Sequence, residues 1–438
     1  MLRWNTCGLA LAAAALVLGG CASSGSAPMT TEQREQHMAS FDQVWVTVRD
    51  RHWDKDMNGV DWEAAREQYR PRVESAEDAG DVRRAIANML GELDASHYGL
   101  IPASTYEAMD RGETPGGDGD AGLAVRLVDG EMLVWKTRPD GPADAAGVRT
   151  GWALRSIRGE NVAPLIGALS EMDGVSRGET MLPLVIASRL GGPIGGSLDL
   201  VFEDGDGNEQ AVTLVLDESP GERVGLGNLP PVPVEIETET LSGGIGYFRL
   251  SIFLDPPRVM PAFSGFVREH RGAPGIVIDL RGNPGGIILM ASGMGGHLVE
   301  EKDIYLGKLI MRESELRLVL NPRGKPYAGK VAVLIDEVSI SNSEILSAGL
   351  KDVGRARLFG RRTAGQVLPS TVERLPNGDG FQYAFANYTS ASGESLERSG
   401  VEPDVEIELD RDTLLEGRDA TLEAALDWIL EDRRASGG

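Results

Sequence analysis

The sequence predicts an α/β protein in which a helical segment and a β-rich segment precede a core of alternating strands and helices. Residues 35–110 carry apolar residues at helical spacing. Residues 116–217 are rich in glycine and contain short segments of alternating apolar and polar residues, as in half-buried strands. From residue 235 onward, short apolar strands alternate with helical patterns, which is typical of an α/β core. A chain of 438 residues is long enough for two or three such domains.

The composition disfavours two classes of partner. The net charge is −24 and is spread along the chain, which argues against binding to nucleic acid or to anionic lipid. The 56 glycines fit a protein built of short strands and tight turns. Histidine, cysteine and aspartate show no clustered spacing of the kind that binds metals, and we predict no cofactor.

The amino terminus is interpreted as a targeting segment. Residues 1–20 contain Arg3 and an apolar run that is too short to span a membrane, followed by Leu18-Gly19-Gly20-Cys21. That tetrapeptide resembles a bacterial lipobox, in which the cysteine is lipidated; the alternative is an ordinary signal peptide with a chance cysteine. Residues 21–34 would form a flexible tether. By resemblance to sorting rules, Ala22 favours the periplasmic face of the outer membrane, with lipidated Cys21 as the membrane contact.

Residues 35–115 are predicted to form a helical domain. Residues three and four apart form one apolar face, at Phe41, Val44, Trp45 and Val48. A second helix is predicted from Asp61 and a third over Val82–Leu93, and a polar turn with Ser96 and His97 follows. A lone histidine at a helix end is usually structural. Only five histidines exist in the chain, however, and His297 is the only serious rival for a catalytic role.

Residues 116–217 are predicted to form a β-rich domain. It begins with the glycine-rich segment that leads into Gly122-Leu123-Ala124 and contains a strand over Met132–Trp135. The later segments Pro142–Val148 and Gly151–Ile157 complete a pattern that resembles a PDZ domain. The resemblance implies that a peptide adds to the domain as a strand, with its carboxylate on backbone amides near Gly122. The alternative is a module that only packs or gates.

Residues 218–234 are rich in proline and glycine and are predicted to be a linker, and residues 235–410 to form the core. Buried strands are expected at Gly244–Leu250 and Gly275–Leu280, and the second leads into the Arg281–Gly286 loop and a helix. A hairpin is expected around Asn377-Gly378. Residues 411–438 should contain a closing helix.

The segment Val331–Asp352 is the candidate centre of the site. Val331–Ile335 is typical of a strand buried on both faces, and a helix is predicted after the polar turn that contains Ser341. A hydroxyl on such a turn faces the positive end of the helix dipole, which suits a nucleophilic serine. The alternative is that Ser341 and Glu344 form only a capping box.

Four motifs together resemble the tail-specific, or C-terminal processing, serine peptidases and the tricorn core protease. They are Asp-Leu-Arg-Gly-Asn-Pro-Gly-Gly at 279–286, Ser-x-Ser-x-Ser-Glu-Ile at 339–345, Gly-x-x-Thr-Ala-Gly at 360–365 and Glu-x-x-Gly-Val-x-Pro-Asp at 397–404. The resemblance implies a crotonase-like α/β core. It also implies an endopeptidase that acts on peptides or unfolded proteins through an acyl-enzyme.

One departure from the motif decides which branch the chain resembles. The tail-specific branch uses a lysine base at the position that Gln366 occupies here, and an amide cannot accept the serine proton. The tricorn-like branch instead uses a histidine in a Ser-His turn and a glutamate. The resemblance therefore implies Ser341 as nucleophile, His97 as general base, Glu397 as the orienting carboxylate and Ser96 as an auxiliary hydrogen-bonding residue.

The oxyanion hole implied by the resemblance consists of backbone N–H groups of Asn342 and of Gly285-Gly286. The alternative for the glycines is an ordinary tight βα loop. The alternative for the whole chain, suggested by Gln366, is a catalytically degenerate, PDZ-containing scaffold that binds peptides at the cell envelope. Some relatives of this fold bind hydrophobic small molecules, which is a third possibility.

Overall fold

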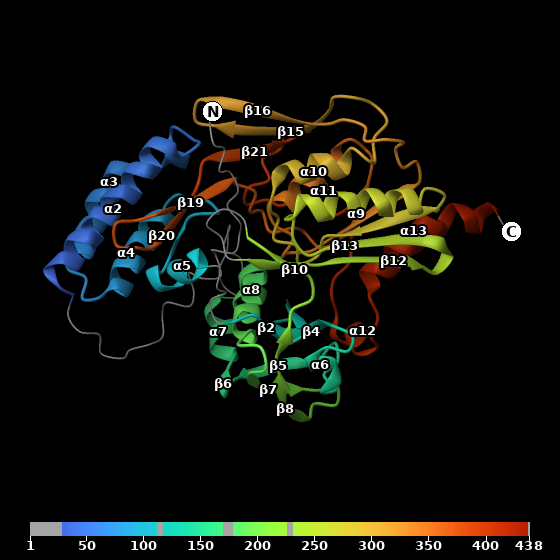
Figure 1. Ribbon diagram of the computed structural model, residues 1–438, viewed down its shortest axis with the longest axis horizontal. Coiled ribbons are helices and arrows are strands. Elements are labelled where there is room, and N and C mark those ends of the chain that lie inside the picture. The colour runs from blue at the N-terminus through green and yellow to red at the C-terminus, as the bar shows by residue number, and fades with distance from the viewer. Residues whose placement is uncertain (1–28, 112–116, 170–177, 226–230, 437–438) are drawn as a thin grey trace.

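The computed structural model describes residues 29–111, 117–169, 178–225 and 231–436. The predicted signal peptide, Cys21 and residues 22–28 of the predicted tether lie outside these ranges. Within them, no helix combines the length and apolar character that crossing a membrane requires. Figure 1 shows three units, which we call the helical unit (29–111), the middle unit (117–225) and the core unit (231–436).

The helical unit is held together by the predicted apolar face. Its helices are α2 (Thr31–Arg51), α3 (Trp62–Glu74), α4 (Ala79–Gly91) and α5 (Ala103–Asp110), with a 3₁₀ turn at Met57–Gly59. All four residues of the face are buried in α2. The indole N–H of Trp45 donates to the Trp62 carbonyl at 2.9 Å, and that of Trp62 donates to the Trp45 carbonyl at 3.0 Å. This reciprocal pair satisfies both buried indoles and fixes α2 against the start of α3.

The helical unit shares its hydrophobic core with a distant hairpin, β19 (Ser370–Arg374) and β20 (Gly380–Ala384). Strand β1 (Gly99–Ile101) pairs antiparallel with β20, with Gly99 opposite Gln382. Figure 1 shows this hairpin lying among the amino-terminal helices. The turn that precedes β1 and contains His97 is therefore fixed to the last third of the chain.

The middle unit is an antiparallel sheet in the order β3-β4-β5-β7-β8, packed around its own apolar core. Its strands are β3 (Leu123–Val128), β4 (Glu131–Thr137), β5 (Ala153–Ile157), β6 (Glu160–Asn161), β7 (Ser197–Glu203) and β8 (Glu209–Val215). Its helices are α6 (Pro142–Ala145), α7 (Ala163–Leu169) and α8 (Gly178–Leu190). Strand β3 is at the sheet edge, and α8 packs beside it.

The core unit is a six-stranded sheet in the order β12-β13-β14-β17-β18-β22, parallel from β13 onward. Its strands are β12 (Ile236–Leu241), β13 (Ile245–Leu250), β14 (Gly275–Asp279), β17 (Lys330–Ile335), β18 (Arg357–Gly360) and β22 (Val405–Glu406). Helices α9 (Pro256–Glu269), α10 (Ile288–Gly295) and α11 (Asn342–Asp352) cover one face, and α13 (Ala420–Ser436) covers the other. The predicted α/β fold class is confirmed.

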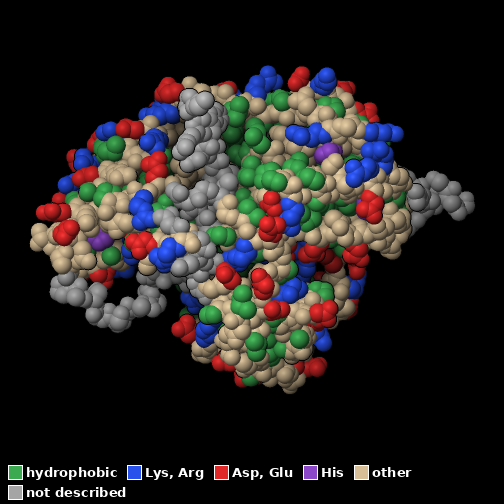
Figure 2. All heavy atoms as spheres, in the orientation of Figure 1, with side chains coloured by type: hydrophobic (Ala, Val, Ile, Leu, Met, Phe, Trp, Pro, Cys, Tyr) green, Lys and Arg blue, Asp and Glu red, His purple; other side chains and the backbone are tan. Residues whose placement is uncertain are grey.

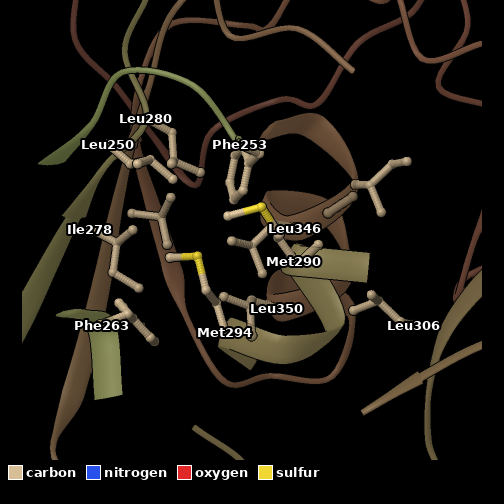
Figure 3. Close-up of a cluster of buried hydrophobic side chains, with 14 of the residues drawn as sticks. Leu250, Phe253, Phe263, Ile278, Leu280, Met290, Met294, Leu306, Leu346 and Leu350 are labelled. Carbon is tan, nitrogen blue, oxygen red and sulfur yellow. The ribbon is translucent and has the colours of Figure 1, made fainter. Parts of the chain in front are cut away.

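The sheet is buried on both faces, which explains the continuous apolar strands. Along β17, Val331 and Val333 point into the core beneath α9 to α11, whereas Ala332 and Leu334 point toward α13. Figure 3 shows side chains of α10 and α11 meeting Ile278 and Leu280 in the first of these layers.

A second sheet, which the sequence pattern did not predict, covers the edge of this layer. It has the order β16-β15-β21 and consists of β15 (Ile304–Met311), β16 (Ser314–Leu320) and β21 (Ala386–Ser390). The remaining elements are β2 (Gly119–Asp120), β9 (Asp217–Glu218), β10 (Glu222–Val224), β11 (Val232–Val234), the 3₁₀ turn Ser242–Gly244 and α12 (Arg411–Leu415).

Candidate active site

Ser341 lies on the turn between β17 and α11, with a backbone conformation that serine rarely adopts. Its φ is 56° and its ψ is −113°, whereas an ordinary helix N-cap residue is extended. Its N–H donates to the Gln366 carbonyl at 3.0 Å and to Glu344 Oε2 at 2.9 Å. The Glu344 contact is that of the predicted capping box, but capping alone does not require a strained backbone. Such strain is concentrated at functional turns.

Glu344 is completely buried and holds the neighbouring loop against the start of α11. Besides the Ser341 N–H, its carboxylate accepts from the N–H of Gly365 at 2.7 Å, the N–H of Gln366 at 3.0 Å and the hydroxyl of Thr363 at 2.6 Å. Burial raises the pKa of Glu344 to about 7, although these donors favour the ionised form. The Ser341 turn is thus fixed by one carboxylate with four donors.

Ser341 opens into an apolar pocket of about 360 Å³. The pocket lies between α10, the β15–β16 hairpin and the open end of the β19–β20 hairpin. It is lined by Gly286, Ile287, Ile288, Leu289, Leu309, Met311, Ser314, Glu315, Leu316, Leu318, Ser341, Pro369, Ser370 and Phe385. Figure 2 shows hydrophobic side chains gathered over α10 and in the hollow beside β15. Two of the lining residues, Leu289 and Leu316, are exposed although they are large and apolar. An exposed apolar hollow of this kind is typical of a ligand site.

The other predicted catalytic residues form a hydrogen-bonded chain. His97 Nδ1 lies 2.8 Å from the Ser96 hydroxyl oxygen, which lies 3.1 Å from Glu397 Oε2. The Ser96 N–H also donates to Glu397 Oε1 at 2.7 Å. Glu397 therefore reaches the imidazole through Ser96 and not directly.

The hydrogen bonds among His97, Ser96 and Glu397 fix the tautomer of His97. Because the Ser96 hydroxyl donates its proton to the carboxylate, it accepts from His97 Nδ1–H, and the lone pair of the imidazole is on Nε2. His97 Nε2 is buried without a hydrogen-bond partner among the described residues. Burial lowers the pKa of His97 to about 4, so the ring is neutral at neutral pH, as a proton acceptor must be.

One peptide group joins the two halves of the site. The Gln366 carbonyl accepts from the Ser341 N–H, and the Val367 N–H of the same planar peptide donates to Glu397 Oε2 at 3.0 Å. The nucleophile turn and the histidine chain thus lie on opposite sides of a single peptide unit. No hydrogen bond joins Ser341 to His97 Nε2 in this structure. Gln366, at the position of the family lysine, is buried within this link.

The glycine loop lies directly against Ser341. A Cβ atom on Gly285, which has a φ of +92°, would lie 2.7 Å from Ser341 Cβ and 2.9 Å from the Asn342 nitrogen. Asn342 is the first residue of α11, so its N–H has no acceptor within the helix. The Gly285 N–H donates to Asn283 Oδ1 at 2.9 Å. In this conformation Gly285 provides close approach, and Asn342 provides the donor beside Ser341.

The remaining predicted residues lie elsewhere. Gly122, Leu123 and Ala124 line a separate pocket of about 570 Å³ between the middle and core units. His297 packs edge-on against Phe263, with ring centroids 5.9 Å apart.

Sequence reasoning missed two residues next to the glycine loop and the Ser341 turn, Arg126 of the middle unit and Asp336 of the core unit. Arg126 donates to Asp336, which follows β17 directly. A charged residue within the apolar strand β3 was the only available signal, and it did not identify a partner 210 residues away.

Two family models match the chain. Residues 244–407, which include Ser341 and Glu397, match the model for peptidase family S41. Residues 33–91, in the helical unit, match the model for the tricorn protease C1 domain.

Known relatives agree with both matches. The chloroplastic C-terminal processing peptidase of Tetradesmus obliquus is 27% identical over 374 residues, which are 84% of this chain and 76% of that protein. The tricorn protease of Thermoplasma acidophilum is 25% identical over 426 residues, which are 93% of this chain but only 36% of that protein. The chain therefore spans about a third of the length of this tricorn relative.

Solved structures with the same fold include the photosystem II D1 C-terminal processing protease, with a TM-score of 0.58 and 24% identity. That match covers 90% of this chain and 99% of the other. Mature CPAF has a TM-score of 0.62 and 14% identity, and the match covers 91% of this chain and 98% of the other.

Proposed function

We propose that this chain, which is a serine peptidase of family S41, cleaves peptides or unfolded proteins through an acyl-enzyme on Ser341, with His97 as general base. The observation that carries the proposal is the His97–Ser96–Glu397 chain, which leaves a neutral imidazole with a buried, unpartnered Nε2. These hydrogen-bonded residues are also connected to the Ser341 turn through the 366–367 peptide.

In the proposed mechanism, His97 Nε2 takes the proton of the Ser341 hydroxyl as its oxygen attacks the scissile carbonyl. The Asn342 N–H donates to the oxyanion. A second donor is expected from Gly285-Gly286, and for Gly285 this requires its N–H to leave Asn283 Oδ1, to which it donates in this structure. The imidazolium then protonates the leaving amine, and water hydrolyses the acyl-enzyme with His97 again as base. Ser96 and Glu397 hold the ring and offset its charge. Because Ser341 and His97 are not hydrogen bonded without substrate, we propose that substrate binding brings them into contact.

The pocket beside Ser341 supports a preference for an apolar side chain next to the scissile bond. Its walls are mostly aliphatic, with Phe385 as the aromatic member. An acidic side chain would lose its hydration there without gaining a partner of opposite charge, because Glu315 is the only charged lining residue. We propose that the Gly122 loop of the middle unit binds the carboxyl end of the same substrates, as the PDZ resemblance implies.

A serine-directed fluorophosphonate probe and a set of peptides test this function. We expect the wild type to be labelled at Ser341 and to cleave peptides with leucine or phenylalanine at the cut at least about 10-fold faster than peptides with aspartate there. Ser341→Ala should abolish labelling, with unchanged circular dichroism as the control for folding. An unlabelled wild type that binds these peptides would instead support the scaffold function, which the glutamine at position 366 favours.

We also propose that the protein is anchored at the cell envelope through lipidated Cys21, on the resemblance of residues 18–21 to a lipobox. Incorporation of labelled palmitate by the wild type but not by Cys21→Ser would support this location, and equal labelling of the two would contradict it.

A further inference from the structure

We propose that Arg126, which belongs to the middle unit, is a positioning residue for the catalytic turns of the core unit. This inference rests on the proposed function, since it concerns the same site. Arg126 lies on β3 and is only 4% exposed. Its guanidinium donates to Asp336 Oδ2 through Nε at 2.9 Å and Nη2 at 2.7 Å, and through Nη1 to the Val125 carbonyl at 2.9 Å.

Asp336 connects this guanidinium to both catalytic loops. Its second oxygen, Oδ1, accepts from the N–H of Gly282 at 2.8 Å and from the N–H of Val338 at 3.1 Å. Gly282 belongs to the glycine loop that packs on Ser341, and Val338 begins the turn that leads to Ser341. One carboxylate, five residues before the nucleophile, therefore sets the distance between the two loops that form the oxyanion hole.

The carboxylate needs its cation in order to remain a fixed acceptor. Burial alone would raise the pKa of Asp336, but Arg126 and the Gly282 N–H hold it below its usual value. Without Arg126, the buried Asp336 carboxylate would lose its two guanidinium donors and would favour protonation or movement. Either response would change the hydrogen bonds to Gly282 and Val338.

Arg126 also contacts the glycine loop directly. A Cβ atom on Gly282, which has a φ of +73°, would lie 2.9 Å from Arg126 Nη2, so the glycine leaves room for the guanidinium. The Trp135 ring lies 4.6 Å from the Arg126 guanidinium carbon and 5.2 Å from that of Arg281, the residue that precedes Gly282. Strands β3 and β4 of the middle unit thus support the loop from one side.

A second contact reaches the same turn from α8. The Thr180 hydroxyl donates to the carbonyl of Glu337, the neighbour of Asp336, at 2.9 Å. The middle unit therefore contacts the catalytic turn from both its edge strand β3 and the helix beside it.

The chain offers a matched control in Arg411, another arginine that joins the middle unit to the end of the chain. Arg411 donates to the carbonyls of Gly151 and Asp204 and pairs with Glu131 and Glu203. None of these residues belongs to the loops around Ser341. Loss of Arg411 removes a contact between units without removing support for the site.

The test compares Arg126→Ala, Arg126→Lys and Arg411→Ala in the full chain, by peptide cleavage and by the rate of fluorophosphonate labelling. Misplacing the oxyanion donors should lower kcat and the labelling rate of Arg126→Ala by about 100-fold, with KM within about threefold of the wild type. Methylguanidinium at millimolar concentration should restore part of the rate, because it fits the space left by the side chain. Arg126→Lys should be intermediate, and Arg411→Ala should be within about threefold of the wild type.

Several results would overturn the inference. Wild-type kcat in folded Arg126→Ala would do so. The inference would also fail if Arg126→Ala unfolded while folded Arg126→Lys kept the wild-type kcat, because Arg126 would then have only a structural role. An equal loss in Arg411→Ala would point to general docking of the middle unit. Failure of the wild type to cleave or to be labelled would contradict the proposed function itself and is thereby distinguished from these results.

Discussion

The Ser341 turn and the His97 turn each contain a residue with a positive φ, but the two turns are held in place by different contacts. Both residues have a positive φ, 56° for Ser341 and 63° for His97. The Ser341 turn is built by one continuous strand-turn-helix unit, 331–352, whose strand and helix are buried in the same core. The His97 turn depends on Glu397, which lies 301 residues after Ser96, and on pairing of the next strand with β20. The proposed nucleophile is therefore positioned by one local segment of the sequence, whereas the proposed base is positioned by tertiary contacts.

The largest expected effect is the loss of kcat when Ser341 or His97 is replaced, and it shows whether the two turns act as one site. Ser341→Ala and His97→Ala should each lower kcat by at least about 10⁴-fold, because each removes a partner in the same proton transfer. The double variant should be no worse than either single variant, since residues that act as a unit are not additive. Steady-state kinetics of the three variants on one apolar peptide provide the measurement. A double variant that shows the product of the two single losses would mean that the turns act independently.

The next effect concerns the carboxylate that reaches His97 through Ser96. Burial raises the pKa of Glu397 to about 7. Its two oxygens accept from the Ser96 N–H, the Ser96 hydroxyl and the Val367 N–H, and only the ionised form leaves both oxygens free to accept. We therefore expect kcat/KM to increase as pH rises through about 7. His97, with a pKa of about 4, stays neutral over this range and adds no step. Glu397→Gln should lower kcat/KM by about 10²–10³-fold at pH 8, because a misoriented imidazole is a poor base.

The same variant decides which group gives the pH dependence. In Glu397→Gln the limb near pH 7 should be absent, and the low activity should be flat from about pH 6 to 9. A limb that persists there would have to come from another group, either His97 or Glu344, whose pKa burial also raises to about 7. Glu397 would then not be the group that controls the rate near neutral pH. A fluorogenic peptide assayed in buffers of constant ionic strength is sufficient for the profile.

The same contrast explains what the sequence could predict. The helical start of the chain, the core strands β13, β14 and β17 and the turn at Ser341 follow from apolar periodicity, because each element is buried in a regular way. The β15–β16 hairpin was missed because strands such as 314–320 expose most of their early residues and lack a continuous apolar pattern. The pocket wall that it forms was therefore missed as well.

Within the site, the residues of the histidine chain could be named from their motifs, but their connections could not. The position of Ser96 between His97 and Glu397 depends on a contact that spans 301 residues. The ties of Val367 to Glu397 and of Arg126 to Asp336 likewise join segments that no local pattern relates. Periodicity predicts which face of an element is buried, but not which polar groups meet across two units.

The smallest expected effect concerns an exposed ion pair beside the His97 turn. Arg398, next to Glu397, donates through Nε to the Asp94 carbonyl at 2.9 Å and pairs with the Asp94 carboxylate at 2.5 Å. Both side chains are about half exposed, so the pair should contribute less than about 1 kcal/mol, and Arg398→Ala should lower kcat/KM by less than about fivefold. Added salt screens exposed pairs, so 0.5 M NaCl should reduce the difference from the wild type. A loss as large as that of Glu397→Gln would mean that this exposed pair, and not the buried chain through Ser96, holds the imidazole in place.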